Sequence, residues 1–297
     1  MNKLIKKADI LIEALPYIRN FAGKTVVIKY GGKAMVHDEL KEGFAEDVVL
    51  LKYVGLKPII VHGGGPQINE MLDKLGIEAK FLHGVRVTDG PTMEIVEMVL
   101  GGQINKEIVS FLNQHGAKAV GLTGKDGQLL TTKPFNPKSL VHTYSGSTEV
   151  LHPEDYGLVG EVSHVDTTLL HTLQEANFIP VIAPIGVDPK WQTHNINADL
   201  VAGSVAAAVH AEKLLVLSDV KGIRDAKHRH VSTLSRKDME RMVKKHVISE
   251  GMLPKVHACL TALQGGVRKA HIIDGRVPHA VLLEIFTDKG IGTEIVA

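Results

Sequence analysis

The sequence predicts an α/β fold in which a mainly parallel β-sheet carries helices on both faces. Short runs rich in β-branched residues alternate along the chain with longer runs whose apolar residues recur at helical spacing. This alternation is typical of consecutive βα units, whose helices cover the sheet. A chain of 297 residues can bury a substantial core, as one large domain or as two lobes.

The first element is an amphipathic helix over residues 3–20. Its apolar residues form one stripe: Leu4, Ala8, Leu11, Leu15 and Ile18. The helix lies in front of the first strand, and another surface must cover this stripe.

The βα series follows this helix. Strands are expected at 25–30, 57–61, 117–122, 178–183, 213–217 and 269–273, with a short closing strand at 294–296. Helices are expected at 39–54, 66–75, 92–115, 167–176, 198–210 and 254–263. Between Gly124 and Val165, short β-like runs are punctuated by Gly, Pro and Ser, which favours hairpins. We expect a lobe boundary at the polar turn 188–194.

Composition argues against several classes of protein. The net charge is +1, from 34 basic and 33 acidic residues, so no basic surface for nucleic acid or an anionic membrane is indicated. No apolar run approaches the length of a membrane span, and the N-terminus lacks the apolar core of a signal peptide. A single cysteine fits a reducing compartment. We therefore expect a cytoplasmic protein with small-molecule ligands, and no nucleic-acid or membrane partner.

The histidines and the cysteine do not predict a metal site. None of the sixteen histidines forms a helical His-x-x-x-His pair or a cluster with cysteine, and His228 and His230 lie in a basic polar loop expected at the surface. Cys259 shares an apolar helix face with Val256 and Leu263, which favours a core position over a nucleophile. We expect no protein-bound metal and no prosthetic group.

Two glycine-rich turns each follow a β-like run, at Gly31–Gly32 and at 63–66. In a parallel sheet both turns lie beyond the carboxyl ends of the strands, where ligands collect. Glycine lets backbone N–H groups converge on an anion. One such turn alone is more often a simple tight turn, but two on successive strands favour a phosphate site. Neither turn fits the P-loop or the dinucleotide-binding pattern.

The segment 194–199 places Asn195, Asn197 and Asp199 just before the apolar helical run 200–209. Such side chains cap a helix, and the free N–H groups and the helix dipole favour an anion there. Lys29, at the end of the first strand, could reach a phosphate held by the neighbouring glycines, or could simply be solvated. Arg86 could clamp a carboxylate through two hydrogen bonds, or be an exposed strand residue.

With these residues assembled, the chain resembles the amino-acid kinase family, and within it the members that phosphorylate N-acetyl-L-glutamate in arginine biosynthesis. The resemblance covers nearly the whole chain. It rests on six motifs: Val-Ile-Lys-Tyr-Gly-Gly at 27–32, Val-His-Gly-Gly-Gly-Pro-Gln-Ile at 61–68, Gly-Val-Arg-Val-Thr at 84–88, Asn-Ile-Asn-Ala-Asp at 195–199, Leu-Ser-Asp-Val-Lys-Gly at 217–222 and Gly-Met-Leu-Pro-Lys-Val at 251–256. The motifs at 61–68 and 84–88 are the most specific of these.

The resemblance implies a fold and an activity. The fold would be a three-layer αβα sandwich, with a helix at 1–24, an acetylglutamate-binding and dimerising lobe at 25–190, and a nucleotide-binding lobe at 191–297. The reaction would transfer a phosphoryl group from ATP, with Mg²⁺, to the γ-carboxylate of N-acetylglutamate. That carboxylate is already ionised at pH 7, so the attack needs no general base. The site must supply positioning and relief of charge repulsion.

The resemblance also implies roles for individual residues. The acetylglutamate binders would be Gly64, Gly65, Arg86, Asn195 and Asn197. Lys29 and Lys255 would stabilise the transition state, and Asp199 would hold both lysines in place. The nucleotide would meet Lys29, Gly31, Gly32, Ser218, Asp219, Lys221 and Lys255.

The resemblance finally implies that arginine regulates the protein. Arginine-inhibited members carry an extra N-terminal helix that interlaces dimers into a hexamer, a trimer of dimers, and helix 3–20 matches it. The arginine pocket would be formed by Tyr17, Lys213, His271, Glu284 and Gly290. Whether a nitrogen-signalling regulatory protein binds the ring stays open. Two alternatives also stay open: a family member acting on aspartate, glutamate, carbamate or UMP, and a non-catalytic arginine sensor.

Overall fold

The computed structural model describes residues 2–137, 152–248, 250–287 and 290–297. Within these ranges the central sheet has eight strands in the order β12-β14-β13-β11-β1-β2-β8-β5. Every neighbouring pair is parallel except β13 and β14, so the predicted mainly parallel sheet is confirmed. The strands are β1 (Thr25–Tyr30), β2 (Lys57–His62), β5 (Ala119–Thr123), β8 (Ile179–Ala183), β11 (Lys213–Ser218), β12 (Thr233–Ser235), β13 (Lys269–Asp274) and β14 (Thr293–Val296).

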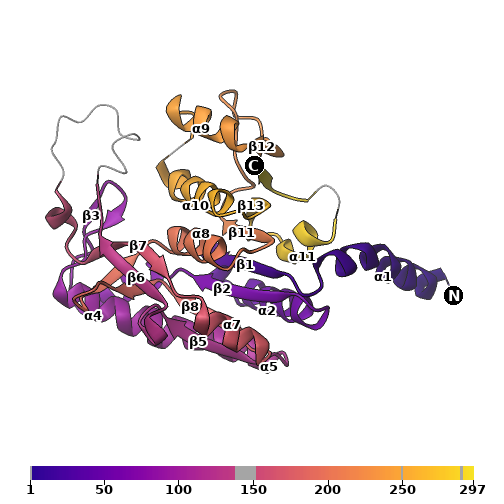
Figure 1. Cartoon of the computed structure of the whole chain (residues 1–297), viewed down its shortest axis with the longest axis horizontal. Coiled ribbons are helices and arrows are strands. Elements are labelled where there is room, and N and C mark those ends of the chain that lie inside the picture. Colours follow the sequence, from indigo (N-terminus) through magenta and orange to yellow (C-terminus); the bar gives the residue numbers. More distant parts are fainter. Residues whose placement is uncertain (1, 138–151, 249, 288–289) are drawn as a thin grey trace.

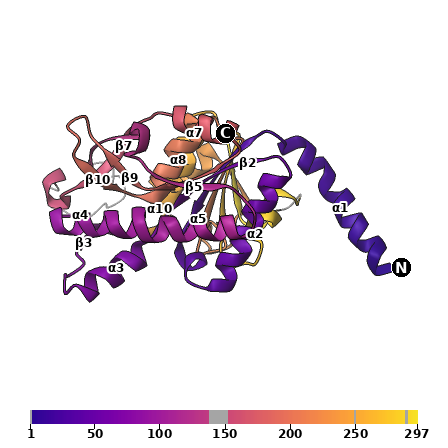
Figure 2. The ribbon, with the colours of Figure 1, turned by 90° about the horizontal axis from the view of Figure 1, so that it is seen from below.

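Helices cover both faces of this sheet, which gives the predicted three-layer αβα sandwich (Figure 1; Figure 2). One face packs against α2 (Asp38–Tyr53), α3 (Gly65–Lys74), α4 (Gly90–Glu97), a π-helix (Met98–Ile104), α5 (Asn105–Gln114) and α11 (Ala280–Ile285). The other face packs against α7 (Thr168–Glu175), α8 (Ala198–Ala208), α9 (Arg236–Lys244) and α10 (Leu253–Gln264). Short 3₁₀ turns lie at Gly32–Met35, Asp126–Gln128, Pro153–Tyr156 and Glu250–Met252.

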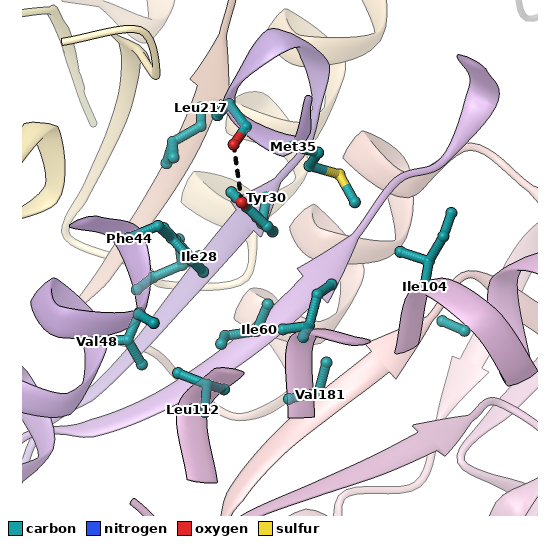
Figure 3. Close-up of a cluster of buried hydrophobic side chains, with 14 of the residues drawn as sticks. Ile28, Tyr30, Met35, Phe44, Val48, Ile60, Ile104, Leu112, Val181 and Leu217 are labelled. Atoms are coloured by element: carbon teal, nitrogen blue, oxygen red, sulfur yellow. Dashed lines mark hydrogen bonds between the residues drawn. The ribbon is translucent and has the colours of Figure 1, made fainter. Parts of the chain in front are cut away.

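Strand β1 divides its side chains between the two layers. Ile28 and Tyr30 pack into the core on the α2 side, where Figure 3 shows them with Phe44 and Ile60. Val27 packs into the opposite core, against α8 and α10. Because side chains alternate along a strand, Lys29 projects to the same face as Val27. The sheet therefore directs Lys29 toward α8 and α10.

A smaller sheet stands beside the central one. Strands β6 (Leu130–Pro134), β7 (Val159–Val165), β9 (Ile185–Val187) and β10 (Thr193–Ile196) form a closed barrel among the described residues. β6 and β7 pair antiparallel, which confirms hairpin structure between Gly124 and Val165 as far as the chain is described. A two-stranded hairpin, β3 (Phe81–Leu82) with β4 (Val85–Arg86), completes the strands.

Several elements differ from the prediction. The helix expected at 92–115 is wrong as a single α-helix, because a π-helix interrupts it at Met98–Ile104. Residues 193–196, expected as the approach to a helix, form the strand β10. The short elements β9, β12, α9 and α11 were not predicted. The proposed lobe boundary at 188–194 falls on the connection between β9 and β10 and stays a prediction.

The N-terminal helix α1 (Asn2–Phe21) confirms the helix expected at 3–20. In both views it extends away from the sandwich, with the N-terminus at its outer end (Figure 1; Figure 2). Leu4 is 65% exposed and Leu11 72% exposed, so the described chain leaves the apolar stripe uncovered. Of the helices described, none is long and apolar enough to span a membrane.

Candidate active site

The two glycine turns lie side by side at the carboxyl ends of β1 and β2. Parallel pairing brings Tyr30 opposite His62, and the N–H of Gly63 donates to the carbonyl of Tyr30 at 2.8 Å. Gly31 leaves room for the ammonium group of Lys29, since a Cβ there would stand 2.6 Å from its nitrogen and would displace it. The predicted meeting of the two turns is therefore confirmed.

Lys29, Asp199 and Lys255 form one ion-paired group from three elements, β1, α8 and α10. The Nζ of Lys29 lies 3.0 Å from Oδ1 of Asp199, and the Nζ of Lys255 donates to Oδ2 at 2.8 Å. All three side chains are largely buried, with Lys255 the most exposed at 16%. One carboxylate thus orients two ammonium groups and screens their mutual repulsion.

The environment of Asp199 keeps it ionised. Burial by itself would raise the pKa of the Asp199 carboxyl, but the ammonium groups of Lys29 and Lys255 outweigh it and hold that pKa below its usual range. A carboxylate so engaged accepts hydrogen bonds and does not take up a proton at neutral pH. The Asp199 carboxylate therefore holds the ammonium groups of Lys29 and Lys255 in position.

A cavity of about 510 Å³ opens beside this group. Asp199 and Lys255 line it, together with the second glycine turn, Gly63–Gly65. Its other walls come from β4, β7, β10 and the start of α10. The predicted acceptor residues Gly64, Gly65, Arg86, Asn195 and Asn197 all line this same cavity. Its volume suits a small organic acid.

Arg86 presents an unused hydrogen-bond donor at this cavity. Its Nη2 donates to the carbonyl of Gly65 at 3.2 Å, and its guanidinium lies over the ring of Phe81. Its Nη1 is buried and has no hydrogen-bond partner among the described residues. A buried, unpaired guanidinium donor is costly, which favours an anionic ligand as its partner.

The two asparagines differ in how the fold holds them. Asn197 caps α8, since its Oδ1 accepts from the backbone N–H of Asp199 at 2.8 Å, and this confirms the predicted helix cap. Asn195 lies in β10 rather than at the helix entrance, and its Nδ2 donates to Oγ1 of Thr88 at 3.2 Å.

Among the other predicted residues, Gly32 and Asp219 are in contact. Asp219, directly after β11, accepts a 2.6 Å hydrogen bond from the N–H of Lys33, and it packs against Gly32, whose φ of +71° suits glycine. Ser218 is buried at the end of β11, and Lys221 is exposed. None of Gly31, Gly32, Ser218, Asp219 and Lys221 lines the 510 Å³ cavity.

A second cavity of about 590 Å³ lies at the base of α1. It is lined by all five residues predicted for an effector pocket: Tyr17, Lys213, His271, Glu284 and Gly290. His271 and Glu284 share a 2.5 Å hydrogen bond between Nδ1 and Oε1, and the Nε2 of His271 is buried without a partner in the described chain.

The remaining expectations concern metals and cysteine. Cys259 is fully buried, as predicted, and burial raises the pKa of its thiol. Among the described residues, no cluster of three or more His, Cys, Asp or Glu side chains could hold a metal ion.

Sequence reasoning missed part of the cavity wall. Leu100, Phe135 and Val159 line the cavity but carry no local signal, because they come from the π-helix, the residue after β6 and the start of β7, far apart in the chain. Only the tertiary packing brings them to the acceptor residues.

Comparison with known proteins identifies the family. The chain is 56% identical to an acetylglutamate kinase of Pelobacter propionicus over 99% of both chains, and 56% identical to one of Geotalea daltonii over the full length of both. A solved N-acetylglutamate synthase of Neisseria gonorrhoeae, complexed with coenzyme A and N-acetyl-glutamate, superposes on 98% of this chain with a TM-score of 0.82 at 25% identity. This chain spans 63% of the synthase. The family model described as "Amino acid kinase family" matches residues 24–274, and the chain belongs to that family.

Proposed function

We propose that this protein transfers the γ-phosphoryl group of ATP to the γ-carboxylate of N-acetyl-L-glutamate, in arginine biosynthesis. The observation that carries the proposal is the Lys29–Asp199–Lys255 group at the edge of a cavity with an unpaired Arg86 donor. The full-length similarity to acetylglutamate kinases supports the choice of acceptor.

In this proposal the acceptor is anchored at the end away from the reacting carboxylate. The guanidinium of Arg86 pairs with the α-carboxylate, and Asn195 and Asn197 hydrogen-bond the remaining polar groups. The backbone N–H groups of Gly64 and Gly65 lie at the start of α3, where a helix leaves its first donors without internal partners. They are suited to the γ-carboxylate and to the phosphoryl group it receives.

The chemical step then needs charge stabilisation and alignment. The γ-carboxylate oxygen attacks the γ-phosphorus, the bond to the bridging oxygen breaks, and ADP leaves with the electron pair. No proton has to be removed, because the nucleophile is an anion. Lys29 and Lys255 offset the repulsion between the acceptor and the triphosphate, while Asp199 keeps both ammonium groups aimed.

The nucleotide would bind at the group formed by Gly31, Gly32, Ser218, Asp219 and Lys221. Supporting this, Gly32 and Asp219 are in contact, Asp219 accepts from the N–H of Lys33, and neither Gly32 nor Asp219 lines the 510 Å³ cavity. Mg²⁺ enters with ATP as part of the substrate and would neutralise phosphate charge.

We also propose that arginine inhibits the enzyme from the second cavity. Burial would raise the pKa of Glu284, but hydrogen bonds from His271 and from the N–H groups of Ile291 and Gly292 hold it below its usual range. A buried carboxylate in a cavity of this size suits a guanidinium group. Lys213, buried in the same wall, suits the carboxylate of an amino acid.

A hexamer completes the proposal. The exposed apolar residues of α1 would pack against the same helix of a neighbouring dimer, which supplies the cover that the described chain lacks. We place the protein in the cytoplasm, which agrees with a single, buried thiol.

The test is acyl phosphate formation. Purified protein is incubated with Mg²⁺, ATP and hydroxylamine, using N-acetylglutamate and free glutamate in parallel, each with and without arginine. Hydroxamate from the acetylated acceptor alone, suppressed by arginine, is expected. Turnover of glutamate, aspartate, carbamate or UMP instead would assign another family activity, and arginine binding without any product would indicate a non-catalytic sensor.

A further inference from the structure

A buried hydrogen-bonded pair, His62 and Asn105, lies directly beneath the glycine turn of the acceptor cavity. His62 is fully buried at the end of β2, and Asn105 is fully buried at the start of α5. Neither side chain lines the cavity or the Lys29–Asp199–Lys255 group. The roles proposed above leave this pair without a function.

The hydrogen bonds assign one tautomer to His62. The ring Nδ1 lies 2.8 Å from the carbonyl oxygen of Gly63. A carbonyl only accepts, so Nδ1 carries the hydrogen. The other ring nitrogen, Nε2, lies 3.2 Å from the carboxamide nitrogen of Asn105 and accepts from it. His62 is therefore a neutral ring with its hydrogen on Nδ1.

The surroundings of Asn105 fix the direction of its amide. Its Nδ2 also lies 2.9 Å from the carbonyl oxygen of Val181, and its Oδ1 accepts from the ammonium group of Lys106 at 3.1 Å. Turning the amide over would set an oxygen against the carbonyl of Val181 and a nitrogen against an ammonium group. Burial lowers the pKa of His62 to about 4, which agrees with a neutral ring.

The π-helix before Asn105 also packs against the same turn. A Cβ at Gly64 would clash with the side chains of Leu100 and Ile104, the third and the last residues of the π-helix. These two residues and Asn105 thus contact Gly64 and His62 from one continuous segment. π-Helical turns inside α-helices occur frequently at functional sites.

We propose that Asn105, with the π-helical turn that leads to it, is a positioning element for the acceptor-binding glycine turn. Asn105 selects the tautomer of His62 that holds the carbonyl of Gly63, while Leu100 and Ile104 press on Gly64. The turn is thereby fixed where its free N–H groups meet the acceptor. This inference rests on the proposed function for the identity of the acceptor, but the hydrogen bonds themselves can be tested without it.

The first experiment reads the tautomer directly. In ¹⁵N-labelled protein at pH 7, the two ring nitrogens of His62 are assigned by comparison with His62→Asn. A protonated Nδ1 and an unprotonated Nε2 are expected in the wild type. In Asn105→Asp, whose carboxylate cannot donate to Nε2, the hydrogen is expected to move to Nε2 or the ring to become protonated. A hydrogen on Nε2 in the wild type would overturn the proposal, whatever the enzyme's activity.

The second experiment separates acceptor binding from nucleotide binding. Asn105→Asp should raise the KM for N-acetylglutamate at least about tenfold, the scale of one buried hydrogen bond, and change the KM for ATP less than about twofold. His62→Asn, whose amide can still donate to the Gly63 carbonyl, should keep a lower acceptor KM than His62→Leu. Gln114→Glu, the same chemical change at an exposed position of α5, is the control.

The outcomes distinguish a failure of the proposed function from a failure of the positioning role of Asn105. A wild type that does not phosphorylate N-acetylglutamate contradicts the proposed function, and the ring spectrum still decides the inference. An active wild type with unchanged acceptor KM in Asn105→Asp contradicts the inference alone. Equal rises in both KM values, together with a lower Tm, would indicate only a structural role and would also overturn it.

Discussion

Gly203 of α8 is in direct backbone contact with Ala258 of α10. A Cβ at position 203 would stand 2.6 Å from the carbonyl oxygen and 2.7 Å from the Cα of Ala258. The two helices can approach this closely only because position 203 has no side chain. Four residues before Gly203 is Asp199, and three residues before Ala258 is Lys255, so the close contact sets the spacing of that ion pair.

Gly203→Ala should therefore impair catalysis through geometry. The added methyl group must push α10 away from α8, an overpacking that costs about 1–3 kcal/mol of unfolding free energy. We expect kcat to fall by a larger factor than either KM changes. The reason is that Lys255 moves, whereas Arg86 and Asn195, which are proposed to bind the acceptor, do not. Steady-state kinetics and urea unfolding measure both effects. The control is Gly43→Ala in α2, where a Cβ would meet open space; equal kinetics for the two variants would contradict the prediction.

The two lysines should be indispensable to the chemical step. Lys29→Ala or Lys255→Ala is expected to lower kcat at least ~10²-fold, the scale of losing one positioned donor in a charge-stabilising site. Each substitution also leaves Asp199 with one ammonium partner instead of two. Hydroxamate assays at saturating substrates measure kcat. A kcat near the wild-type value for both variants would end the proposed mechanism.

Arg86→Lys should weaken acceptor binding selectively. Lysine keeps the charge but loses the planar fork that can hold a carboxylate by two hydrogen bonds while donating to Gly65. The KM for N-acetylglutamate is expected to rise at least about tenfold, the scale of one charge-assisted hydrogen bond, with the KM for ATP nearly unchanged. Arg236→Lys, on the surface of α9, serves as the matched control. A rise in the KM for ATP instead would place Arg86 on the nucleotide side.

Removing residues 1–20 should separate regulation from catalysis. The truncated protein is expected to form active dimers that arginine no longer inhibits, because both the exposed stripe and Tyr17 are lost. Light scattering and arginine titrations of activity check this. Leu11→Asp, which keeps the helix, should also break the hexamer. A truncated protein that is still an arginine-inhibited hexamer would refute the assignment.

Stability should depend on pH through His62. Its pKa is lowered from 6.5 to about 4 in the folded protein, so its contribution is present above pH 6.5 and is lost as the pH falls toward about 4. Over that range the unfolded chain binds a proton that the folded chain does not. Between pH 7.5 and pH 4.5 the free energy of unfolding should fall by about 2.5 kcal/mol more in the wild type than in His62→Asn. Urea unfolding at pH 7.5 and pH 4.5 measures the difference; parallel changes in both proteins would contradict it.

The sequence predicted the central sheet because its strands are apolar and flanked by glycine turns. It predicted the Asn197 cap because side chains of this type at the start of an apolar helix have a local function. It could not predict the π-helix, since an inserted turn barely changes the apolar spacing over 92–115. Helix α9 was missed because Met239 is its one fully buried residue among the described side chains. The strand β10 was missed because its polar residues resemble a helix cap.

The candidate site also has a part that the sequence could predict and a part that it could not. That the two glycine turns would meet at one edge of the sheet was predictable, because the carboxyl ends of neighbouring parallel strands lie at the same edge. The support beneath them was not, since the contact of Asn105 with His62 joins residues 43 positions apart. Such pairs depend on which helix packs on which strand, and the local pattern does not contain that information.

Helix α1 contributes both to the second cavity and to an exposed apolar surface. Tyr17 lines the second cavity and makes an edge-to-face contact with Phe286, whereas Leu4 and Leu11 are exposed to solvent. If a neighbour holds the helix in place, effector affinity and assembly are thermodynamically linked, and each must strengthen the other by the same free energy. Dilution of the protein would then weaken arginine binding, and saturating arginine would lower the protein concentration at which the assembly dissociates.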